Sequence, residues 1–96
     1  MTSQRFVIDV GGIFFCSTRS TLSKSPTLKK LVDASENSEL FIDRESSSFV
    51  FILNYLRTGL ILQDLHDKSY IKCLINEAQF YGIPDMVPLL RDMTYL

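Results

Sequence analysis

The sequence has few of the residues from which metal and catalytic sites are usually built. It contains one histidine and two cysteines in 96 residues, whereas zinc sites take three or four ligands at close spacing. His66 and Cys73 are the one pair close enough in sequence to suggest zinc ligands, and no further cysteine cluster supplies the remaining ligands. Two cysteines are also too few for a disulfide scaffold. We therefore expect no metal and no cofactor. Because Cys16 and Cys73 each lie in an apolar pattern, we also expect two buried thiols in a reducing, cytoplasmic compartment.

Sequence patterns typical of enzymes are also missing. The serines at 46–48 lack the GxSxG setting of a nucleophilic serine. Gly11-Gly12 is followed by no phosphate-binding pattern and no helix. Nothing suggests an orienting acid beside either cysteine. An enzyme that uses Cys73 and His66 stays open as a third hypothesis, but the sequence predicts a protein that is not an enzyme.

Charge of one sign and long apolar runs are absent as well. The chain has 10 basic and 11 acidic residues and no basic run, which argues against a nucleic-acid partner. No run reaches the roughly 18 apolar residues of a membrane span, and the polar start MTSQRF lacks a signal-peptide core. Hydrophobic content of 46% is ordinary for a globular protein. We expect one domain over residues 5–93, preceded by a tail of residues 1–4.

The first regular feature is a hairpin. Two runs rich in β-branched and aromatic residues, RFVIDV and IFFC, flank Gly11-Gly12. Two glycines can take the positive φ that a tight hairpin turn requires. Phe6, Ile8 and Val10 alternate with their neighbours and should form the core face of the first strand.

Two short helices should follow, and then a loop and a strand. Ser20 or Thr21 can cap the first helix, which Pro26 interrupts or restarts. The second helix has an apolar stripe at helical spacing: Leu28, Leu31 and Val32. The polar residues 33–39 predict an exposed loop, and residues 40–42 a short strand.

Segment 41–59, FIDRESSSFVFILNYLRTG, has a charged entrance and an apolar interior. Ser46, or else Glu45, is expected to cap a helix there, and Gly59 to end it in a left-handed conformation. The helix should pack on most of its circumference, because its polar strip is narrow: Asn54, Arg57 and Thr58.

The last third predicts a docked connection and two more helices. Three leucines suit an extended, partly docked segment: Leu60, Leu62 and Leu65. Asp67 or Ser69 can cap a helix that ends at Gly82, with an apolar stripe of Ile71, Leu74, Ile75 and Ala78. Asp85 can cap the last helix with Pro88 in its first turn, and its inward residues should be Val87, Leu90 and Met93. The element order predicts an α+β domain with a small hairpin sheet and about five helices.

Large apolar residues exceed what one small core needs. Phe14 and Phe15 are adjacent, so a strand directs them to opposite faces. Phe51 and Tyr55 lie off the main stripe of their helix. Contiguous exposed aromatic residues mark a surface for a partner, so we expect a protein-interaction function.

Three segments, in this order and spacing, resemble the BTB/POZ domain of the potassium-channel tetramerisation type. IDVGGIFFCSTRSTL is similar to the family's strand, NVGG and TL pattern; FIDRESSSFVFILNYLRTG resembles FIDRDPxxFxxILNYLRTG; INEAQFYGI resembles LLxEAxFYGI. The closer branch is the soluble KCTD-like proteins. Asp9 replaces the usual Asn, and Glu45-Ser46 the usual Asp-Pro. The zinc-binding motif of some channel branches is absent, so the resemblance implies no metal.

The resemblance implies a non-enzymatic module that forms ring-like homo-oligomers, either tetramers or pentamers. It also implies an adaptor for cullin-3 ubiquitin ligases; the alternative is the cytoplasmic tetramerisation domain of a voltage-gated potassium channel. By motif, the ring contacts map to Gly11, Gly12, Asp43, Arg44 and Arg57. Candidate cullin-3 contacts lie in the later helices and in the 33–39 loop, at Asp33, Ser35, Glu36, Asn37 and Glu39.

Asp43 and Arg44 pose a specific question. If they are adjacent on a strand, their side chains point in opposite directions and cannot easily pair with each other. At least one of them is then expected to contact a neighbouring chain. The alternative is that both are solvated or capping charges.

Overall fold

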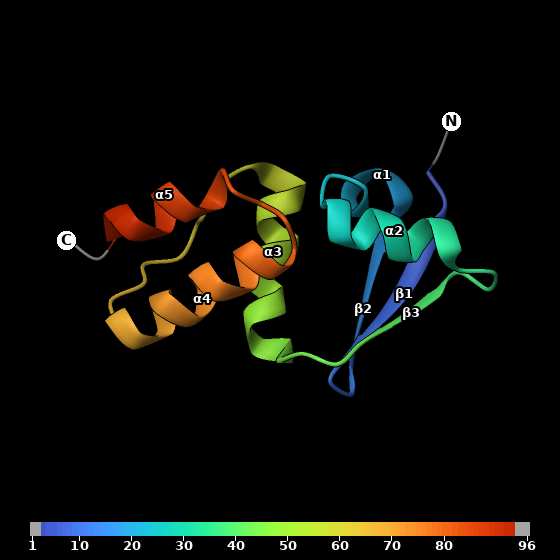
Figure 1. The fold of residues 1–96 in the computed structure, drawn as a ribbon, viewed down its shortest axis with the longest axis horizontal. Coiled ribbons are helices and arrows are strands. Elements are labelled where there is room, and N and C mark those ends of the chain that lie inside the picture. The colour runs from blue at the N-terminus through green and yellow to red at the C-terminus, as the bar shows by residue number, and fades with distance from the viewer. Residues whose placement is uncertain (1–2, 94–96) are drawn as a thin grey trace.

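The computed structural model describes residues 3–93 and has two halves side by side (Figure 1). The sheet half contains strands β1 (Arg5–Val10), β2 (Ile13–Thr18) and β3 (Glu39–Ile42) and helices α1 (Arg19–Leu22) and α2 (Pro26–Ala34). The helical half contains α3 (Ser46–Thr58), α4 (Lys68–Phe80) and α5 (Met86–Asp92). The predicted α+β class is confirmed. Of the expected tail, residues 1–4, the first two lie outside the described residues.

The sheet has the order β2-β1-β3. β1 and β2 form the predicted antiparallel hairpin, and Gly11 and Gly12 in its turn have φ of 58° and 98°. The Asp9 carboxylate accepts a 2.8 Å hydrogen bond from the Gly12 N–H, which fixes the turn. β3 pairs with β1 in parallel. A parallel pair needs a long crossover, and α1 and α2 provide it.

The inner face of the sheet forms half of the core. Phe6, Ile8 and Val10 are at most 1% exposed, as their alternation predicts. Leu28 and Val32 of α2 are fully buried in the same core cluster. Leu31 was expected beside them but is 37% exposed. The prediction for Leu31 is wrong because the buried stripe of this short helix includes only Leu28 and Val32.

The caps of the first two helices differ partly from the prediction. Thr18, not Ser20 or Thr21, caps α1 and accepts from the Thr21 N–H, because β2 runs directly into the helix. Pro26 restarts the chain as the first residue of α2, and Ser25 caps it. The buried Ser25 hydroxyl also donates to the Tyr81 carbonyl at 2.6 Å. This bond ties α2 to the end of α4.

α3 begins at Ser46, one residue earlier than an N-cap at Ser46 would give. Glu45 occupies the N-cap position and Ser46 is the first helical residue, so the expectation for Ser46 is wrong. The Glu45 side chain caps no backbone N–H and instead accepts from the Ser47 hydroxyl. Gly59 has a φ of 75° and donates its N–H to Tyr55, which confirms the left-handed stop. The buried apolar residues are Phe49, Ile52, Leu53 and Leu56.

The connection and last two helices follow the prediction in part. Asp67 caps α4 through its carboxylate. Asp85 precedes α5 as expected, but its side chain makes no cap hydrogen bond. Leu60 and Leu62, expected to dock, are 58% and 67% exposed. In the extended connection the alternate residues face the core, where Ile61 and Leu65 pack.

Both cysteines are exposed, against the expectation of buried thiols. Cys16 lies opposite Val7 on the outer side of the hairpin. Cys73 lies on α4 between the buried Ile71 and Leu74 in sequence but on a different side of the helix. Apolar sequence neighbours did not reveal which face each thiol takes. None of the helices within residues 3–93 has the length and apolarity needed to cross a bilayer.

Candidate protein-interaction surface

The outer face of the sheet carries large apolar side chains that remain exposed. Strand pairing sets Asp9 opposite Phe14 and beside Phe41. Phe14 is 70% exposed, Phe41 64% and Val7 41%. Val7, Phe14 and Phe41, together with the flanking carboxylates of Asp9 and Glu39, are called the sheet-face patch below. A contiguous apolar patch with a polar rim is typical of a surface that binds another protein.

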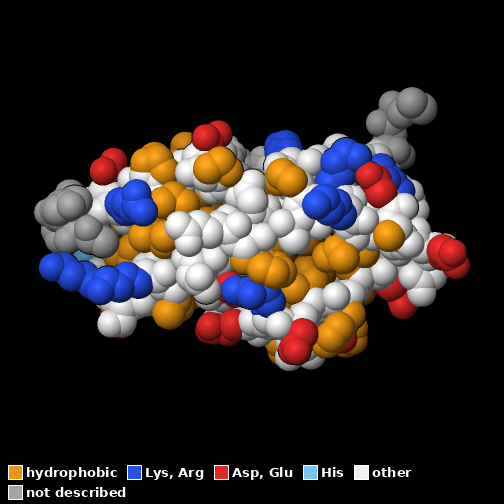
Figure 2. Space-filling view, viewed as in Figure 1, with side chains coloured by type: hydrophobic (Ala, Val, Ile, Leu, Met, Phe, Trp, Pro, Cys, Tyr) orange, Lys and Arg blue, Asp and Glu red, His pale blue; other side chains and the backbone are white. Residues whose placement is uncertain are grey.

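This patch is hollowed and its rim is acidic. A hollow of about 490 Å³ is lined by Val7, Asp9, Phe14, Asn37, Glu39, Leu40 and Phe41. In the sheet half, Lys and Arg side chains gather over α1 and α2, while acidic side chains line the opposite margin (Figure 2). An acidic rim favours a partner surface with positive charge.

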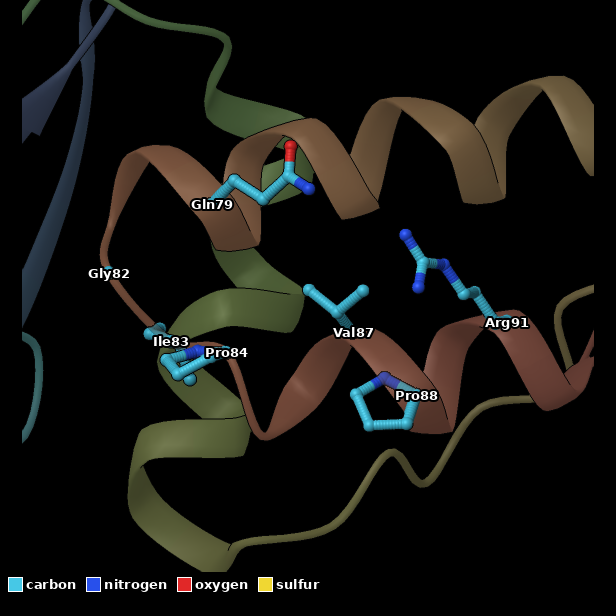
Figure 3. Close-up of a pocket in the computed structure, with 7 residues that line it drawn as sticks. All are labelled: Gln79, Gly82, Ile83, Pro84, Val87, Pro88 and Arg91. Carbon is cyan, nitrogen blue, oxygen red and sulfur yellow. The ribbon is translucent and has the colours of Figure 1, made fainter.

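A second hollow of about 440 Å³ lies between α4 and α5, where Val87 and Arg91 point toward the α4 side (Figure 3). Two of its four apolar lining side chains are part of the core already, since Ile83 and Val87 are 6% and 8% exposed, and only Pro84 and Pro88 are exposed. It therefore offers less uncovered apolar surface than the sheet-face patch.

Four of the five expected ring-contact residues come together at the hairpin end of the sheet. The Gly11 N–H donates to the Ile42 carbonyl at 3.0 Å. A Cβ on Gly11 would lie 2.5 Å from the Arg44 carbonyl oxygen, so the turn packs directly on the segment after β3. β3 ends at Ile42, so Asp43 and Arg44 follow the strand rather than belong to it. The expectation that they share a strand is wrong.

Arg44 has a partner within its own chain. Its Nε donates to Glu77 Oε2 at 2.9 Å, and its Nη2 donates to the same oxygen. The guanidinium carbon also lies 3.9 Å from the centre of the Phe80 ring. Glu77 is 6% exposed, and its hydrogen bond raises the pKa of Arg44. This ion pair connects the β3–α3 segment to α4.

Sequence reasoning did not single out Glu77, although a signal was present. Its position next to Ala78 on the apolar stripe of α4 makes it a carboxylate inside a buried face. Buried carboxylates need a cation and hydrogen bonds. Tyr81 lies nearby, and burial, followed by the charge of Glu77, raises the pKa of its hydroxyl above the usual range.

Arg57, the fifth expected ring contact, lies apart from the other four. Its Nη2 donates to the Cys16 carbonyl on β2 at 2.9 Å. Close to the end of α3, Lys24 donates to the Leu56 carbonyl, also at 2.9 Å. Both cations line a hollow of about 330 Å³ beside Gly59.

The expected partner loop is shorter than residues 33–39. Asp33 belongs to α2, where it pairs with Lys29 at 2.6 Å and Arg19 at 3.0 Å. The hydrogen bond from Lys29 is the main cause that lowers the pKa of this carboxyl. Glu39 belongs to β3. Only residues 35–38 form the loop, and within it Asn37 reaches the sheet-face hollow.

The site has no resemblance to a metal centre. Within residues 3–93, no group of three or more His, Cys, Asp or Glu side chains is arranged to hold a metal ion. His66 is exposed on the connection before α4. The arrangement of the described residues supports recognition between proteins.

The small α+β fold with an uncovered apolar sheet face defines the class of a protein-interaction domain. Comparison with protein families agrees. Residues 6–89 match the family model of the BTB/POZ domain. The chain belongs to this family, in its potassium-channel tetramerisation type.

Several curated proteins are similar to this chain. The human BTB/POZ domain-containing protein KCTD14 is 42% identical over 94 residues, covering 90% of this chain and 35% of that protein. The human BTB/POZ domain-containing protein KCTD5 is 34% identical, covering 88% and 40%. The human potassium channel regulatory protein is 33% identical, covering 95% and 36%. The chain therefore spans little more than a third of the length of these relatives.

Proposed function

We propose that this chain is a homo-oligomerising, KCTD-like interaction module that forms a ring of four or five copies in the cytoplasm and has no catalytic role. The observation that carries the proposal is the sheet-face patch. Phe14 and Phe41 are more than 60% exposed on one hollowed surface, although an isolated domain gains nothing from that exposure. Similarity to KCTD14 and KCTD5 supports the KCTD-like assignment.

The size of the patch is adequate for association. Burying one large apolar side chain stabilises by about 1.5–3 kcal/mol, and three such side chains lie together on this face. Association also costs several kcal/mol of lost freedom, so the patch supports binding only if its counterpart also buries apolar surface. The carboxylates of Asp9 and Glu39 would add orientation more than affinity.

The hairpin-end residues have a more limited part in this proposal. Asp43 is exposed next to the Gly11-Gly12 turn and remains a proposed contact with the neighbouring copy. Arg44 is held by Glu77, so we propose that it orients the segment that carries Asp43. Arg57 is proposed as a contact at a separate surface.

The first test is the mass of the native chain in solution. Light scattering over a dilution series is expected to give four or five times the monomer mass at tens of micromolar. The Phe14→Glu variant should give a lower native mass by light scattering, because its copies associate less. Its circular dichroism spectrum should stay that of the wild type. A wild-type protein that is a stable monomer at tens of micromolar would sink the ring proposal.

We further propose that the assembled module is an adaptor for a cullin-3 ubiquitin ligase. The loop supports this, since Glu36 and Asn37 are exposed beside α2, while Ser35 is half-buried. The test is a pull-down of the intact oligomer with the cullin-3 N-terminal region. Binding that weakens in Glu36→Lys but not in Lys30→Glu, an exposed charge reversal on α2 outside the 33–39 loop and the later helices, supports the role. No binding by an intact oligomer removes it.

The second candidate function is the cytoplasmic tetramerisation domain of a voltage-gated potassium channel. The observation that favours it is the similarity to the human potassium channel regulatory protein. Under this alternative the native mass is that of a tetramer, and the full-length gene product carries six apolar membrane-spanning segments after this domain. A pentamer, or a gene product without those spans, would rule it out.

A further inference from the structure

A second exposed apolar surface lies where α3 ends. Leu60 and Leu62 are the most exposed large apolar side chains outside the sheet among the described residues, at 58% and 67%. They follow Arg57 and the Gly59 stop directly in sequence, and Lys24 lines the same hollow as Arg57. Lys24, Arg57, Leu60 and Leu62 are called the α3-exit patch below.

The two cations of the α3-exit patch retain their charge. Lys24 and Arg57 each donate to a backbone carbonyl oxygen at 2.9 Å, not to a carboxylate. A carbonyl is neutral, so it orients a cation without cancelling its charge. One acid, Asp85, lines the same hollow, and the exposed Asp64 lies in the connection beyond Leu62.

The sheet-face patch has the opposite character. Its apolar side chains are flanked by the carboxylates of Asp9 and Glu39, and the one cation on the same face of β1 is Arg5, at the strand end away from the turn. The two leucines of the α3-exit patch lie on the connection after α3, which runs through the helical half, away from the sheet (Figure 1). Lys24, which follows α1, and Arg57, which is bonded to the Cys16 carbonyl of β2, lie where the two halves meet. One copy can therefore offer both patches at once to two neighbours.

We propose that the sheet-face patch of one copy packs against the α3-exit patch of the next copy. The inference rests on the proposed self-association and adds which two surfaces meet. The leucines of the α3-exit patch contact the phenylalanines of the sheet-face patch, and its cations face Asp9 and Glu39. Both surfaces then lose their exposed apolar area, and each charge gains an opposite partner.

Charge decides between this pairing and its alternatives. Two sheet-face patches brought together would juxtapose two acidic rims, and two α3-exit patches would juxtapose four cations. Like charges that face each other in an interface carry an energetic cost and disfavour association. The head-to-tail pairing avoids this cost, and it is the kind of contact that closes into a ring when the rotation between copies is right.

A mixing experiment tests the pairing. Phe14→Glu removes the sheet-face patch and leaves the α3-exit patch intact; Leu62→Glu does the reverse. Leu89→Glu is the control, since Leu89 is 42% exposed on α5 and belongs to neither patch. Circular dichroism verifies that each variant is folded, and light scattering gives the mass of each variant alone and of a 1:1 mixture.

Each variant alone is expected to be a monomer, and the mixture a dimer and nothing larger, because only one complementary pair of patches remains. The Leu89→Glu protein should keep the wild-type mass. If the wild type and the Leu62→Glu variant are both oligomers, the pairing is wrong and the self-association stands. The same conclusion follows if the wild type is an oligomer but the mixture stays monomeric. If the wild type is itself a monomer, the proposed function fails first and the pairing with it.

An exchange of charges between the two patches tests the same pairing independently of the apolar contacts. Arg57→Glu should weaken association about tenfold or more, and adding Glu39→Arg to the same chain should recover most of that loss. The Glu39 carboxylate makes no hydrogen bond or ion pair within the described residues, so its replacement leaves the fold undisturbed. If the double variant is weaker than Arg57→Glu alone, these two charges do not face each other.

Discussion

The two faces of the three-stranded sheet come from the same strands but differ in how far their large apolar side chains are exposed to solvent. On the inner face, Phe6, Ile8, Val10, Leu40 and Ile42 are 0–7% exposed. On the outer face, Val7, Phe14 and Phe41 are 41–70% exposed. In an ordinary half-buried sheet the outer residues are polar. Here three large apolar side chains stay exposed among the polar residues of the outer face. The inner face accounts for folding, and the exposed apolar side chains of the outer face need a second explanation, which we assign to assembly.

The largest expected effect separates the two faces directly. In the monomeric Phe14→Glu background, Ile8→Ala should lower the free energy of unfolding by about 2–4 kcal/mol, because it leaves a cavity in a fully buried site. Val7→Ala, one residue away on the outer face, should cost less than about 1 kcal/mol. Urea denaturation followed by circular dichroism measures both. Equal losses would mean that the outer face also stabilises the single chain.

A slightly smaller effect is expected where the sheet joins the helices. Arg44→Ala leaves Glu77 buried without its cation and should cost about 3 kcal/mol in the same background. Arg57→Ala is the matched control: this exposed arginine bonds a carbonyl on β2, and its loss should cost about 0.5 kcal/mol. The comparison fails if both arginines contribute alike to the free energy of unfolding.

The hairpin turn provides a third comparison, between adjacent glycines. Alanine at either position must adopt a positive φ, which costs about 1–2 kcal/mol. A Cβ at Gly11 also meets the Arg44 carbonyl, whereas nothing lies within 4 Å of one at Gly12. Gly11→Ala should therefore destabilise by about 1 kcal/mol more than Gly12→Ala. Thermal unfolding at matched concentration measures the difference, and a larger loss for Gly12→Ala would contradict the packing of the turn.

The smallest effect concerns Asp33, on the helix that covers the inner face. Its carboxyl has a lowered pKa in the folded chain, mainly through Lys29. A lowered folded pKa stabilises above the unfolded pKa of about 4, and that stabilisation is lost as the pH falls through the folded value. Asp33→Asn should reduce the loss of stability below pH 4. An NMR titration in which Asp33 has an ordinary pKa would contradict this ion pair.

The fold was largely predictable because its signals are local. Gly11-Gly12 between two strand-like runs predicted the hairpin, and Gly59 and Pro26 predicted a helix end and a helix start. The exact caps were not predictable in the same way. Thr18 rather than Ser20 caps α1, because β2 ends at Thr18. Glu45 precedes α3, but its side chain does not cap the helix. These depend on how neighbouring elements meet.

The candidate site was predictable only in part. The alternation of the first strand predicted its buried face, and the adjacent Phe14 and Phe15 predicted that one of them points outward. That Phe41 joins Phe14 depends on the parallel pairing of β3, which residues 40–42 do not reveal. The partner of Arg44 lies 33 positions away. The sequence question about Asp43 and Arg44 now has half an answer: Arg44 is held by Glu77, and the role of Asp43 stays a prediction.

The most direct test of the assembly account uses the two native thiols. Cys16 lies on the outer face of the hairpin and Cys73 on α4, and both are exposed in the single chain. The rate of maleimide labelling at each thiol is measured by mass spectrometry over a range of protein concentrations. The account predicts that Cys16 becomes protected as the protein assembles. Cys73 shares a hollow with Asp43, so its labelling rate reports separately on the proposed Asp43 contact. Cys16 labelling that stays as fast in the assembled protein as in the dilute one would contradict it.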